Sequence, residues 1–391
     1  MAFQLPKKGF VFWPVATGDS STIVVKENEA IMQIDLHNCS SADEKNSDTT
    51  PIVDELVRLL PKRNKKPYLA VFALTHPDND HILGFGDLLS QVTIGELWHT
   101  PRIFREYKAD LTDDAKKFKE EADRRRKPMI KNGNAVGSGD RLRVIGHDDG
   151  IFKDEKYKDF PKEARSYPGK SIEFLDGEDY IGTFEAFVHA PFKQNEDSAD
   201  TRNNSSLALQ ITLTEGKNAG KALFFGDREY PTIKQIFDVT KERKRDQYLE
   251  WNVQLAAHHC SKKVMFWKDD DAEIETFRED IMDDFEAAAL DSAYMVASCR
   301  SDFTGGQGDN PPHSKAREKY EGIVDAGHFL CTHEYPNKDK PEPIVFTIGS
   351  DGFDFGDERP KGKVAPGFAA AVATARGQDK PPGSQVGFGL P

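Results

Sequence analysis

The sequence predicts an α/β fold in which two β-sheets are stacked and helices cover their outer faces. Candidate strands come in runs with helices between them, and clusters of polar residues stand where strands end. A single domain over residues 1–359, with a charged insertion at 102–170, explains this order more economically than two domains. Residues 360–391 are rich in Gly, Pro and Ala, and we expect them to form a flexible tail.

The first part of the chain alternates strands with helices. The predicted strands are 9–17, 21–27, 30–36 and 68–76, and the predicted helices are 51–60 and 81–91. Gly18-Asp19 is a turn signal between the first two strands. The run 68–76 is continuously apolar, which is typical of a buried strand, and it ends abruptly in ionisable residues.

The middle of the chain is more highly charged. Residues 109–128 predict a helix that is solvated on most of its surface, and the rest of 102–170 is rich in Gly, Asp and Lys. Strand patterns then return at 171–176, 183–190, 206–213, 221–227, 253–259, 293–298, 328–332 and 343–349, with helices near 230–248, 273–290 and 314–322. Most of these strands end next to polar residues.

The composition is that of an acidic protein with a modest core. The chain has 391 residues, of which 37% are hydrophobic and 30% charged, and its formal net charge is −13. It contains no apolar run of membrane-spanning length and no signal-peptide pattern, so we expect a cytoplasmic protein without a membrane partner. The four cysteines form no C-x-x-C pair, which argues against a disulfide framework or a cysteine zinc site.

The negative charge argues against a general nucleic-acid coat, because such proteins neutralise phosphates with Lys and Arg. It does not exclude a nuclease whose metal ions and local basic residues meet the phosphate. Basic runs occur at 62–66, 124–127 and 241–245. Taken singly, each is better explained as a solvated helix face or loop.

The strongest chemical signal is the segment Thr75-His76-Pro77-Asp78-Asn79-Asp80-His81. Two histidines and two carboxylates fall within six residues, directly after a buried strand. A turn there can bring several nitrogen and oxygen ligands together, as a two-metal site requires. The alternative is a polar turn in which Asp80 caps the following helix, and the density of ligand-type residues favours metal binding.

Three weaker signals also stand at strand ends. Asp227 follows Phe224-Phe225-Gly226, His258 and His259 follow Ala256-Ala257, and His189 precedes Ala190-Pro191. Each alone has a structural explanation as a cap, turn or core residue. Adjacent histidines in an extended chain point to opposite faces, so we expect one of His258 and His259 to bind metal while the other supports it or contacts substrate.

Together these segments resemble the metallo-β-lactamase fold, whose signature is H-x-[H/D]-x-D-H, then a strand-end His, then Gly-Asp and a late His. Here Asp78 stands where that family more often has a second His. The resemblance implies a four-layer αββα sandwich.

The sequence further resembles the metallo-β-lactamase domain of ComEC-type competence proteins. The segments that carry this likeness are Thr17-Gly18-Asp19-Ser20, Ile34-Asp35, residues 75–81, Asn204-Ser205-Ser206-Leu207, Phe225-Gly226-Asp227, His258 to Lys262, and Asn310-Pro311-Pro312-His313. Cys260 replaces a Gly of that family, and the last segment has its Gly and Pro altered. The membrane channel of the transport proteins is missing, so DNA uptake is not implied.

The resemblance implies two divalent metal ions, Zn or Mn, with Mg also compatible. The implied metal ligands are His76, Asp78 and His189 for one ion, Asp80, His81 and either His258 or His259 for the other, and Asp227 as the bridge. Asp19 and Asp35 would support them. Asp80 would also orient the attacking water, and Ser261, Lys262 and His313 would hold a phosphate or protonate a leaving oxygen, unless they only form a polar loop.

The implied reaction is hydrolysis by water activated between the metals. The first hypothesis is a phosphodiesterase or nuclease acting on DNA or RNA. The second is a hydrolase of a small phosphodiester or cyclic nucleotide, which the net charge favours. The third is a metal-bound interaction module without catalysis. A nucleic acid or nucleotide is therefore the expected partner, and the sequence fixes no oligomeric state.

Overall fold

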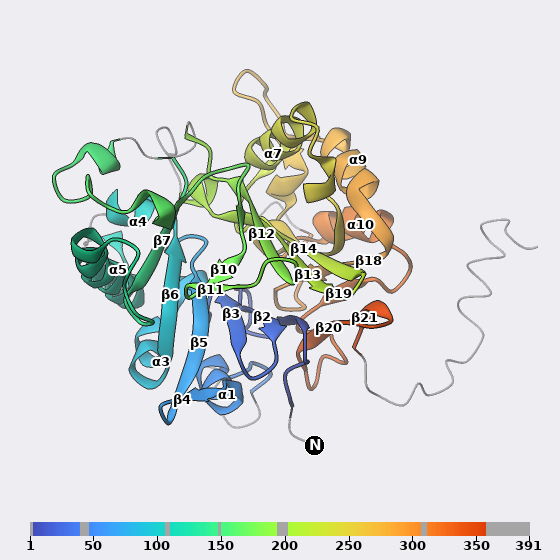
Figure 1. Ribbon diagram of the computed structural model, residues 1–391. Coiled ribbons are helices and arrows are strands. Elements are labelled where there is room, and N and C mark those ends of the chain that lie inside the picture. The colour runs from blue at the N-terminus through green and yellow to red at the C-terminus, as the bar shows by residue number, and fades with distance from the viewer. Residues whose placement is uncertain are drawn as a thin grey trace, which may run out of the picture. The chain divides into compact units, whose positions relative to one another are not determined.

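The structure is a computed structural model that describes residues 3–39, 47–105, 110–147, 150–193, 202–305 and 311–356. The chain divides into a unit Met1–Gly356 and a unit Asp357–Pro391. The predicted tail at 360–391 lies outside the described residues. In the first unit, two sheets pack face to face with helices on both outer sides (Figure 1).

The first sheet contains most of the N-terminal half of the chain. Its order is β21 (Gly352–Phe355), β20 (Ile344–Gly349), β1 (Gly9–Phe12), β2 (Ser21–Lys26), β3 (Ala30–Ile34), β5 (Lys66–Ala73), β6 (Thr93–His99), β7 (Arg141–Ile145) and β8 (Arg165–Ser166), and β4 (Lys62–Arg63) pairs with β5. Pairing is antiparallel from β21 to β3 and parallel from β3 to β8.

The second sheet contains strands from the C-terminal half. Its order is β19 (Phe329–Cys331), β18 (Ala289–Ala297), β15 (Trp251–Leu255), β14 (Asn218–Phe224), β13 (Ala208–Glu215), β12 (Phe184–Ala190) and β9 (Ser171–Ile172). Two small hairpins stand apart, β10 (Phe174–Leu175) with β11 (Glu178–Asp179), and β16 (Phe266–Trp267) with β17 (Thr276–Phe277). The strands β14, β15, β18 and β19 are parallel.

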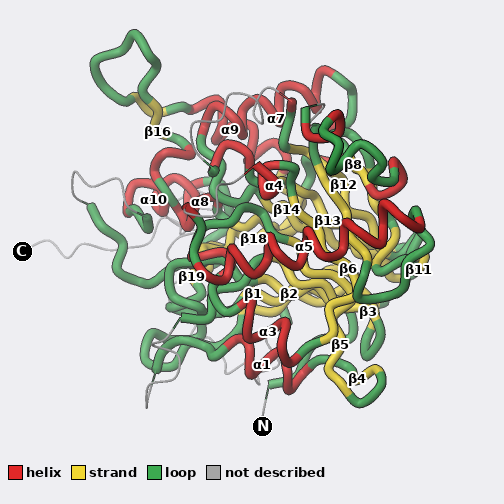
Figure 2. Tube along the Cα trace, turned by 90° about the vertical axis from the view of Figure 1, so that its left-hand side faces the viewer, coloured by secondary structure: helices red, strands yellow, loops and turns green. Residues whose placement is uncertain are grey.

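Helices close both outer faces, as Figure 2 shows from the side. The first sheet is covered by α1 (Ile52–Leu59), α3 (Phe85–Gln91) and α5 (Asp113–Asn132), and the second by α7 (Tyr230–Glu242), α9 (Glu279–Ala288) and α10 (Ser314–Gly322). The short helices are α2 (Asn79–Ile82), α4 (Arg102–Arg105) and α8 (Ala257–Cys260), with 3-10 turns at 151–153, 162–164, 203–205, 246–248 and 262–264. The predicted four-layer α/β arrangement is confirmed.

Alternation along the strands builds the core between the sheets. In β1, Phe10 and Phe12 face the second sheet, whereas Val11 packs under the outer helices. The Phe12 ring centroid lies 6.1 Å from that of Phe224, so this aromatic contact joins the two sheets, and it lies 6.1 Å from that of Phe346 on the neighbouring strand β20.

The charged segment 102–170 contributes to the first sheet and its cover. The charged helix expected at 109–128 forms as α5, most of whose residues are at least partly exposed, and it also carries a buried stripe of Phe118, Ala122 and Met129 against the sheet. The buried Arg125 guanidinium donates to the carbonyls of Ile94, Gly95 and Arg141. Such an apolar stripe is hard to recognise in the sequence, because lysines and arginines stand between its members along the chain.

The structure differs from the predicted secondary structure at three further places, each because of strand pairing between separate segments. β6, which was not predicted, lies between β5 and β7. The helix expected at 273–290 begins only at Glu279, because Thr276 and Phe277 pair with β16. The single strand expected at 171–176 is split into β9 and β10, which belong to different sheets. Among the described residues, none of the helices is both long and apolar enough to cross a membrane.

We expect Phe224→Ala to lower the free energy of unfolding by about 3–5 kcal/mol, because it leaves a cavity between the two sheets. Ile274→Ala is the matched control, since that side chain is 71% exposed. Chemical denaturation monitored by circular dichroism measures both. Equal stability of the two variants would contradict the described core.

Candidate metal centre

Loops at one end of the sandwich bring the predicted ionisable residues together. The loop after β5 supplies His76, Asp78, Asp80 and His81, the loop after β14 supplies Asp227, the loop after β15 supplies His258 and His259, and the ends of β2 and β3 supply Asp19 and Asp35. The parallel pairs β3–β5 and β14–β15 end at the same edge of their sheets. Leu207 N donates to Thr75 O at 3.0 Å and ties the two edges together.

The Asp227 carboxylate lies at the centre of this cluster and is buried. Its Oδ1 lies 3.1 Å from His81 Nε2 and 3.4 Å from His259 Nε2. Its Oδ2 lies 3.8 Å from His76 Nε2 and 3.7 Å from His258 Nε2. Each oxygen therefore faces its own pair of imidazoles, and each pair combines one histidine from the β5 loop with one from the β15 loop.

Two more carboxylates complete the two halves of the cluster. Asp78 Oδ2 lies 3.6 Å from His76 Nε2. Asp80 Oδ2 lies 3.3 Å from His259 Nε2, and its Oδ1 lies 4.0 Å from His81 Nε2. The Asp78 and Asp80 side chains are 34% and 37% exposed, whereas that of Asp227 is 5% exposed. The cluster therefore opens to solvent on the side of Asp78 and Asp80.

His258 and His259 both face Asp227, whereas the sequence predicted one as a metal ligand and the other as its support or a substrate contact. That prediction assumed an extended chain, but β15 already ends at Leu255. Both histidines have a φ of 51°, in the left-handed region, so the chain is coiled there and the two side chains no longer point to opposite faces. Cys260 continues this conformation with a φ of 66°, at the position where the resembled family has Gly.

Carboxylates behind two of the histidines fix their rings. Asp35 Oδ2 lies 2.7 Å from His81 Nδ1, and Asp19 Oδ1 lies 3.3 Å from His259 Nδ1. A ring whose Nδ1–H donates to a carboxylate presents an unprotonated Nε2 on the other side, which is the usual arrangement around metal ligands. Asp35 also accepts hydrogen bonds from the Thr75 backbone and hydroxyl, so its own position is fixed.

The donor set fits a divalent metal ion. Asp19, His81, Asp227 and His259 each offer a ligand atom within 4.8 Å of the others. Nε2 of His76, His81 and His259 and Oδ1 of Asp227 are buried without a hydrogen-bond partner. A buried polar atom left unpaired costs about 1–3 kcal/mol, and cations bound among these side chains would offer such atoms partners.

Burial and shared charge control the protonation of the cluster. Burial opposes charging of His81 and His259, but the Asp227 carboxylate raises the pKa of both rings well above its usual value. The same rings hold the pKa of Asp227 well below its usual value despite burial. Burial lowers the pKa of His76 to about 4. A metal ion would compete with the protons on His81 and His259, so metal affinity falls as the pH falls.

Gly18 and His37 belong to the wall of the cluster. A Cβ at Gly18 would lie 2.2 Å from His37 Nδ1 and 2.8 Å from Asp80 O, so only glycine permits this approach. Asp19 N donates to Asp80 O at 3.0 Å and joins the β1–β2 loop to the β5 loop. Sequence analysis missed His37, whose one signal is its place two residues beyond Asp35.

Arg202 is a second residue that sequence analysis missed. Its Nη1 donates to Asp78 Oδ1 at 2.9 Å, and its Nη2 donates to Asp110 O. It therefore brings a positive charge to the solvent-facing side of the cluster. Its one sequence signal is its position just before Asn204-Ser205-Ser206-Leu207.

His189 has partners elsewhere. Its Nε2 lies 2.8 Å from the Tyr248 carbonyl, and its Nδ1 lies 3.5 Å from Thr240 Oγ1, beneath α7. Both ring nitrogens are thus occupied outside the cluster around Asp227. For this reason we leave His189 out of the ligand set proposed below.

Ser261, Lys262 and His313 have structural contacts. Ser261 is buried, and its Oγ accepts a hydrogen bond from the backbone N–H two residues later. Lys262 Nζ donates to Glu275 Oε1 at 2.7 Å. His313 caps α10 by accepting from Lys315 N at 3.1 Å. Asn310 of the same predicted segment lies outside the described residues.

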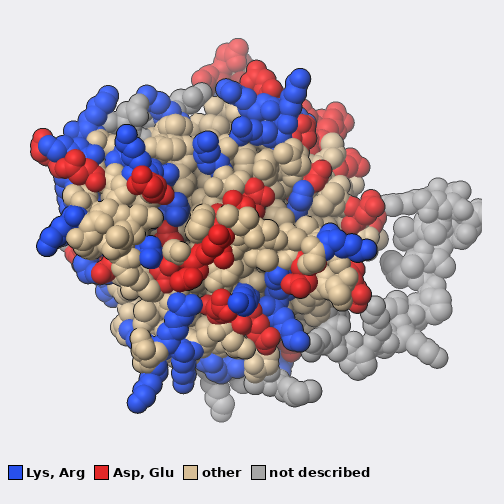
Figure 3. All heavy atoms as spheres, viewed as in Figure 1, with Lys and Arg blue, Asp and Glu red and all other residues tan. Residues whose placement is uncertain are grey.

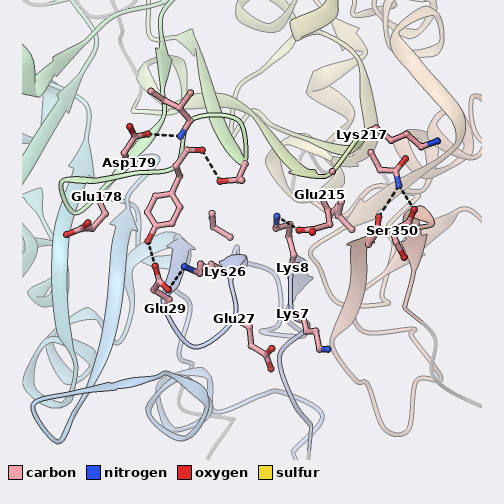
Figure 4. Close-up of a pocket in the computed structure, with 18 residues that line it drawn as sticks. Lys7, Lys8, Lys26, Glu27, Glu29, Glu178, Asp179, Glu215, Lys217 and Ser350 are labelled. Atoms are coloured by element: carbon pink, nitrogen blue, oxygen red, sulfur yellow. Dashed lines mark hydrogen bonds and ion pairs between the residues drawn. The ribbon is translucent and has the colours of Figure 1, made fainter.

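A cavity lies at the other end of the sandwich (Figure 4). It has a volume of about 980 Å³ and is lined by the β2–β3 and β13–β14 turns, whereas Asp19 and Asp227 stand at the opposite ends of β2 and β14. Two of its charged pairs are Lys26 with Glu29 at 2.5 Å and Lys8 with Glu215 at 2.7 Å. We assign the chemistry to the histidine cluster because several buried ligand atoms without hydrogen-bond partners converge there.

No protein-family model matches the sequence, and no curated protein matches it. Several solved structures are similar in structure to part of this chain. A subclass B3 metallo-β-lactamase of Bradyrhizobium japonicum is 15% identical over 64% of this chain and 75% of that one, with a TM-score of 0.28. A B3 metallo-β-lactamase with an active-site glutamic acid is 14% identical over 61% and 73%, with a TM-score of 0.30.

A diphosphatase of the PhnP family is 9% identical over 83% of both chains, with a TM-score of 0.33. At such TM-scores and identities, these likenesses carry no argument about activity.

We expect Gly18→Ala to weaken metal binding about 10–100-fold, because the added methyl group displaces His37 and the Asp80 backbone. Gly137→Ala is the control, since a Cβ there meets nothing within 4 Å. Titration with Zn²⁺ or Mn²⁺ against a competing chelator measures both affinities. Unchanged affinity in Gly18→Ala would show that this approach does not shape the centre.

Proposed function

We propose that this protein is a metal-dependent hydrolase that cleaves phosphodiesters of DNA or RNA with two divalent metal ions. The observation that carries the proposal is the Asp227 carboxylate, whose two oxygens each face a separate pair of histidines. A carboxylate in this position is suited to bridge two cations. The mixture of imidazole and carboxylate donors is compatible with Zn²⁺ or Mn²⁺, and Mg²⁺ is favoured less as the number of histidines rises.

The distances divide the ligands between two proposed positions. His76, Asp78 and His258 would hold one ion together with Asp227 Oδ2. His81, Asp80 and His259 would hold the other together with Asp227 Oδ1. This division replaces His189 with His258 at the first position. Asp35 and Asp19 would orient His81 and His259 through their Nδ1 atoms.

Two bound metal ions would supply a hydroxide near neutral pH and would stabilise the charge that develops on a phosphate during in-line attack. Asp80 is well placed to orient the attacking water, since it is both a carboxylate of the cluster and partly exposed. Arg202, held on Asp78, would offer a cation to the incoming phosphate. Ser261 and His313 serve as caps, and we assign them no chemical step.

The choice of a phosphodiester rests on the motif order, which resembles that of ComEC-type metallo-β-lactamase domains. Nucleic acid as substrate is supported by the same resemblance. Asp78 in place of a histidine adds a hard anionic ligand, which suits metals that act on phosphates.

A second candidate is hydrolysis of a small phosphodiester such as a cyclic nucleotide. The formal net charge of −13 favours it, because tight binding of a polyanion draws on clustered Lys and Arg. Acidic and basic side chains are interspersed over the face shown in Figure 3, with no continuous basic track across it.

We expect purified protein to bind two divalent metal ions per chain, and Asp227→Ala to lose most of this binding because both proposed positions share its carboxylate. His189→Ala should retain the metal, since its nitrogens face Tyr248 and Thr240. Elemental analysis after dialysis, with circular dichroism to verify folding, provides the measurement. Metal loss in a folded His189→Ala would restore that histidine to the ligand set.

We expect metal-loaded protein to cleave single-stranded or double-stranded DNA or RNA, and Asp80→Ala to lower the rate about 10²–10⁴-fold. Glu27→Ala is the control, because Glu27 is exposed and lines the cavity at the opposite end of the sandwich. Product analysis on labelled oligonucleotides measures the rate, and bis(p-nitrophenyl) phosphate and cyclic nucleotides test the second candidate. If metal-replete protein cleaves none of these substrates, the proposed hydrolase activity is refuted.

A further inference from the structure

A second pocket lies beside β12, on the outer side of the second sheet. It has a volume of about 350 Å³ and is enclosed by the segment 168–170 before β9, the β12 residues 187–189, and the C-terminal end of α7. This volume falls within the range of small-molecule sites, which begins at about 300 Å³.

The pocket is separate from the metal centre. α7 begins three residues after Asp227, at Tyr230, and ends at Glu242, close to the pocket residues Val239 and Thr240. Val239 and Thr240 follow Tyr230 by nine and ten residues, so about 14–15 Å of helix separates them from its start. None of the residues that line the pocket belongs to the proposed ligand set.

The charge of the pocket is opposite to that of the chain. Lys170, Arg243 and Arg245 line it, and none of its lining residues is Asp or Glu, although the chain has 66 acidic and 53 basic residues. Arg245 Nη1 donates to the Gly169 carbonyl at 2.7 Å, which fixes that guanidinium at the rim. Within the described part of the chain, Lys170 and Arg243 have no ion-pair partner. Exposed cations without partners attract an anion, and phosphate suits arginine especially well.

The rest of the wall is apolar and aromatic. Phe187 stacks on Tyr248 with ring centroids 3.8 Å apart and is 4% exposed, so it forms the buried base of this wall. Phe192 and Val239 are half-buried and add apolar surface that a ligand can reach. An aromatic ring beside an apolar wall is suited to receive a flat organic group.

His189 connects the segments that form this wall. This gives the histidine a structural role outside the proposed metal centre. Its Nε2–H donates to the Tyr248 carbonyl, so its Nδ1 is left to accept from Thr240 Oγ1 in the neutral ring. Burial lowers the pKa of His189 to about 4, and the ring is neutral at pH 7. The histidine thus connects β12, α7 and the Tyr248 segment at the base of the pocket.

We propose that this pocket binds a small organic phosphate with a flat apolar group, of which a nucleoside monophosphate is the model. The phosphate would lie against Lys170, Arg243 and Arg245, and the flat group would lie against Phe192 and Val239. The pocket supplies both recognition elements side by side, and the proposal does not depend on catalysis at the metal centre.

The test is isothermal titration of the full-length protein with AMP, inorganic phosphate and adenosine, in EDTA to keep metal ions from the other centre. AMP should bind at least about tenfold more tightly than either fragment, because only AMP engages both walls. The double variant Lys170→Gln/Arg243→Gln should weaken AMP binding at least about tenfold, as expected for the loss of charge-assisted contacts. Lys244→Gln, an exposed neighbour outside the pocket, should leave it unchanged.

Phe192→Ala supplies a second variant, which should weaken AMP but not inorganic phosphate. The proposal is overturned if AMP does not bind in EDTA, or if the double variant and Lys244→Gln bind AMP equally well. AMP binding that appears only after metal addition would also overturn it, because that result places the nucleotide at the metal centre. Binding by inorganic phosphate as tight as that of AMP would refute the flat-group half of the proposal.

Discussion

The buried Asp227 carboxylate is the constraint on which this end of the molecule depends. Four imidazoles surround it, two from each sheet, and each oxygen faces one pair. Such a concentration of ligand atoms is costly when the atoms lack partners, because burial removes water from all of them. The two loops that carry the histidines must therefore be held together by the rest of the fold, and a bound cation would convert that cost into a stabilising interaction.

The sandwich supplies the required support. The aromatic contact between Phe12 of β1 and Phe224 of β14 joins the two sheets. At the site end, the left-handed backbone of His258, His259 and Cys260 costs about 1–3 kcal/mol for each residue in that conformation. Strain of this size persists where surrounding packing determines the backbone, and here it places two adjacent rings on one carboxylate.

The charged side chains are distributed differently between the metal centre and the pocket beside β12. Asp78, Asp80 and Asp227 gather at the centre, where cations would offset them and leave the place able to receive a phosphate. The pocket beside β12 contains no carboxylate and has three basic side chains instead. In our proposals, the metal centre would act on phosphates through metal ions, and the pocket beside β12 would bind them through Lys and Arg.

The sequence by itself determined the four-layer α/β arrangement and the segments that meet at the site. Local periodicity and strand ends are properties of short segments, so they can be predicted from sequence. Examples are the alternating strands, the apolar run before His76, and Gly226-Asp227 after another strand. Only the tertiary structure decided that His258 and His259 both reach Asp227, that His189 lies under α7, and that His37 and Arg202 join the wall. These outcomes depend on backbone conformation and on contacts between distant segments, which spacing along the chain does not encode.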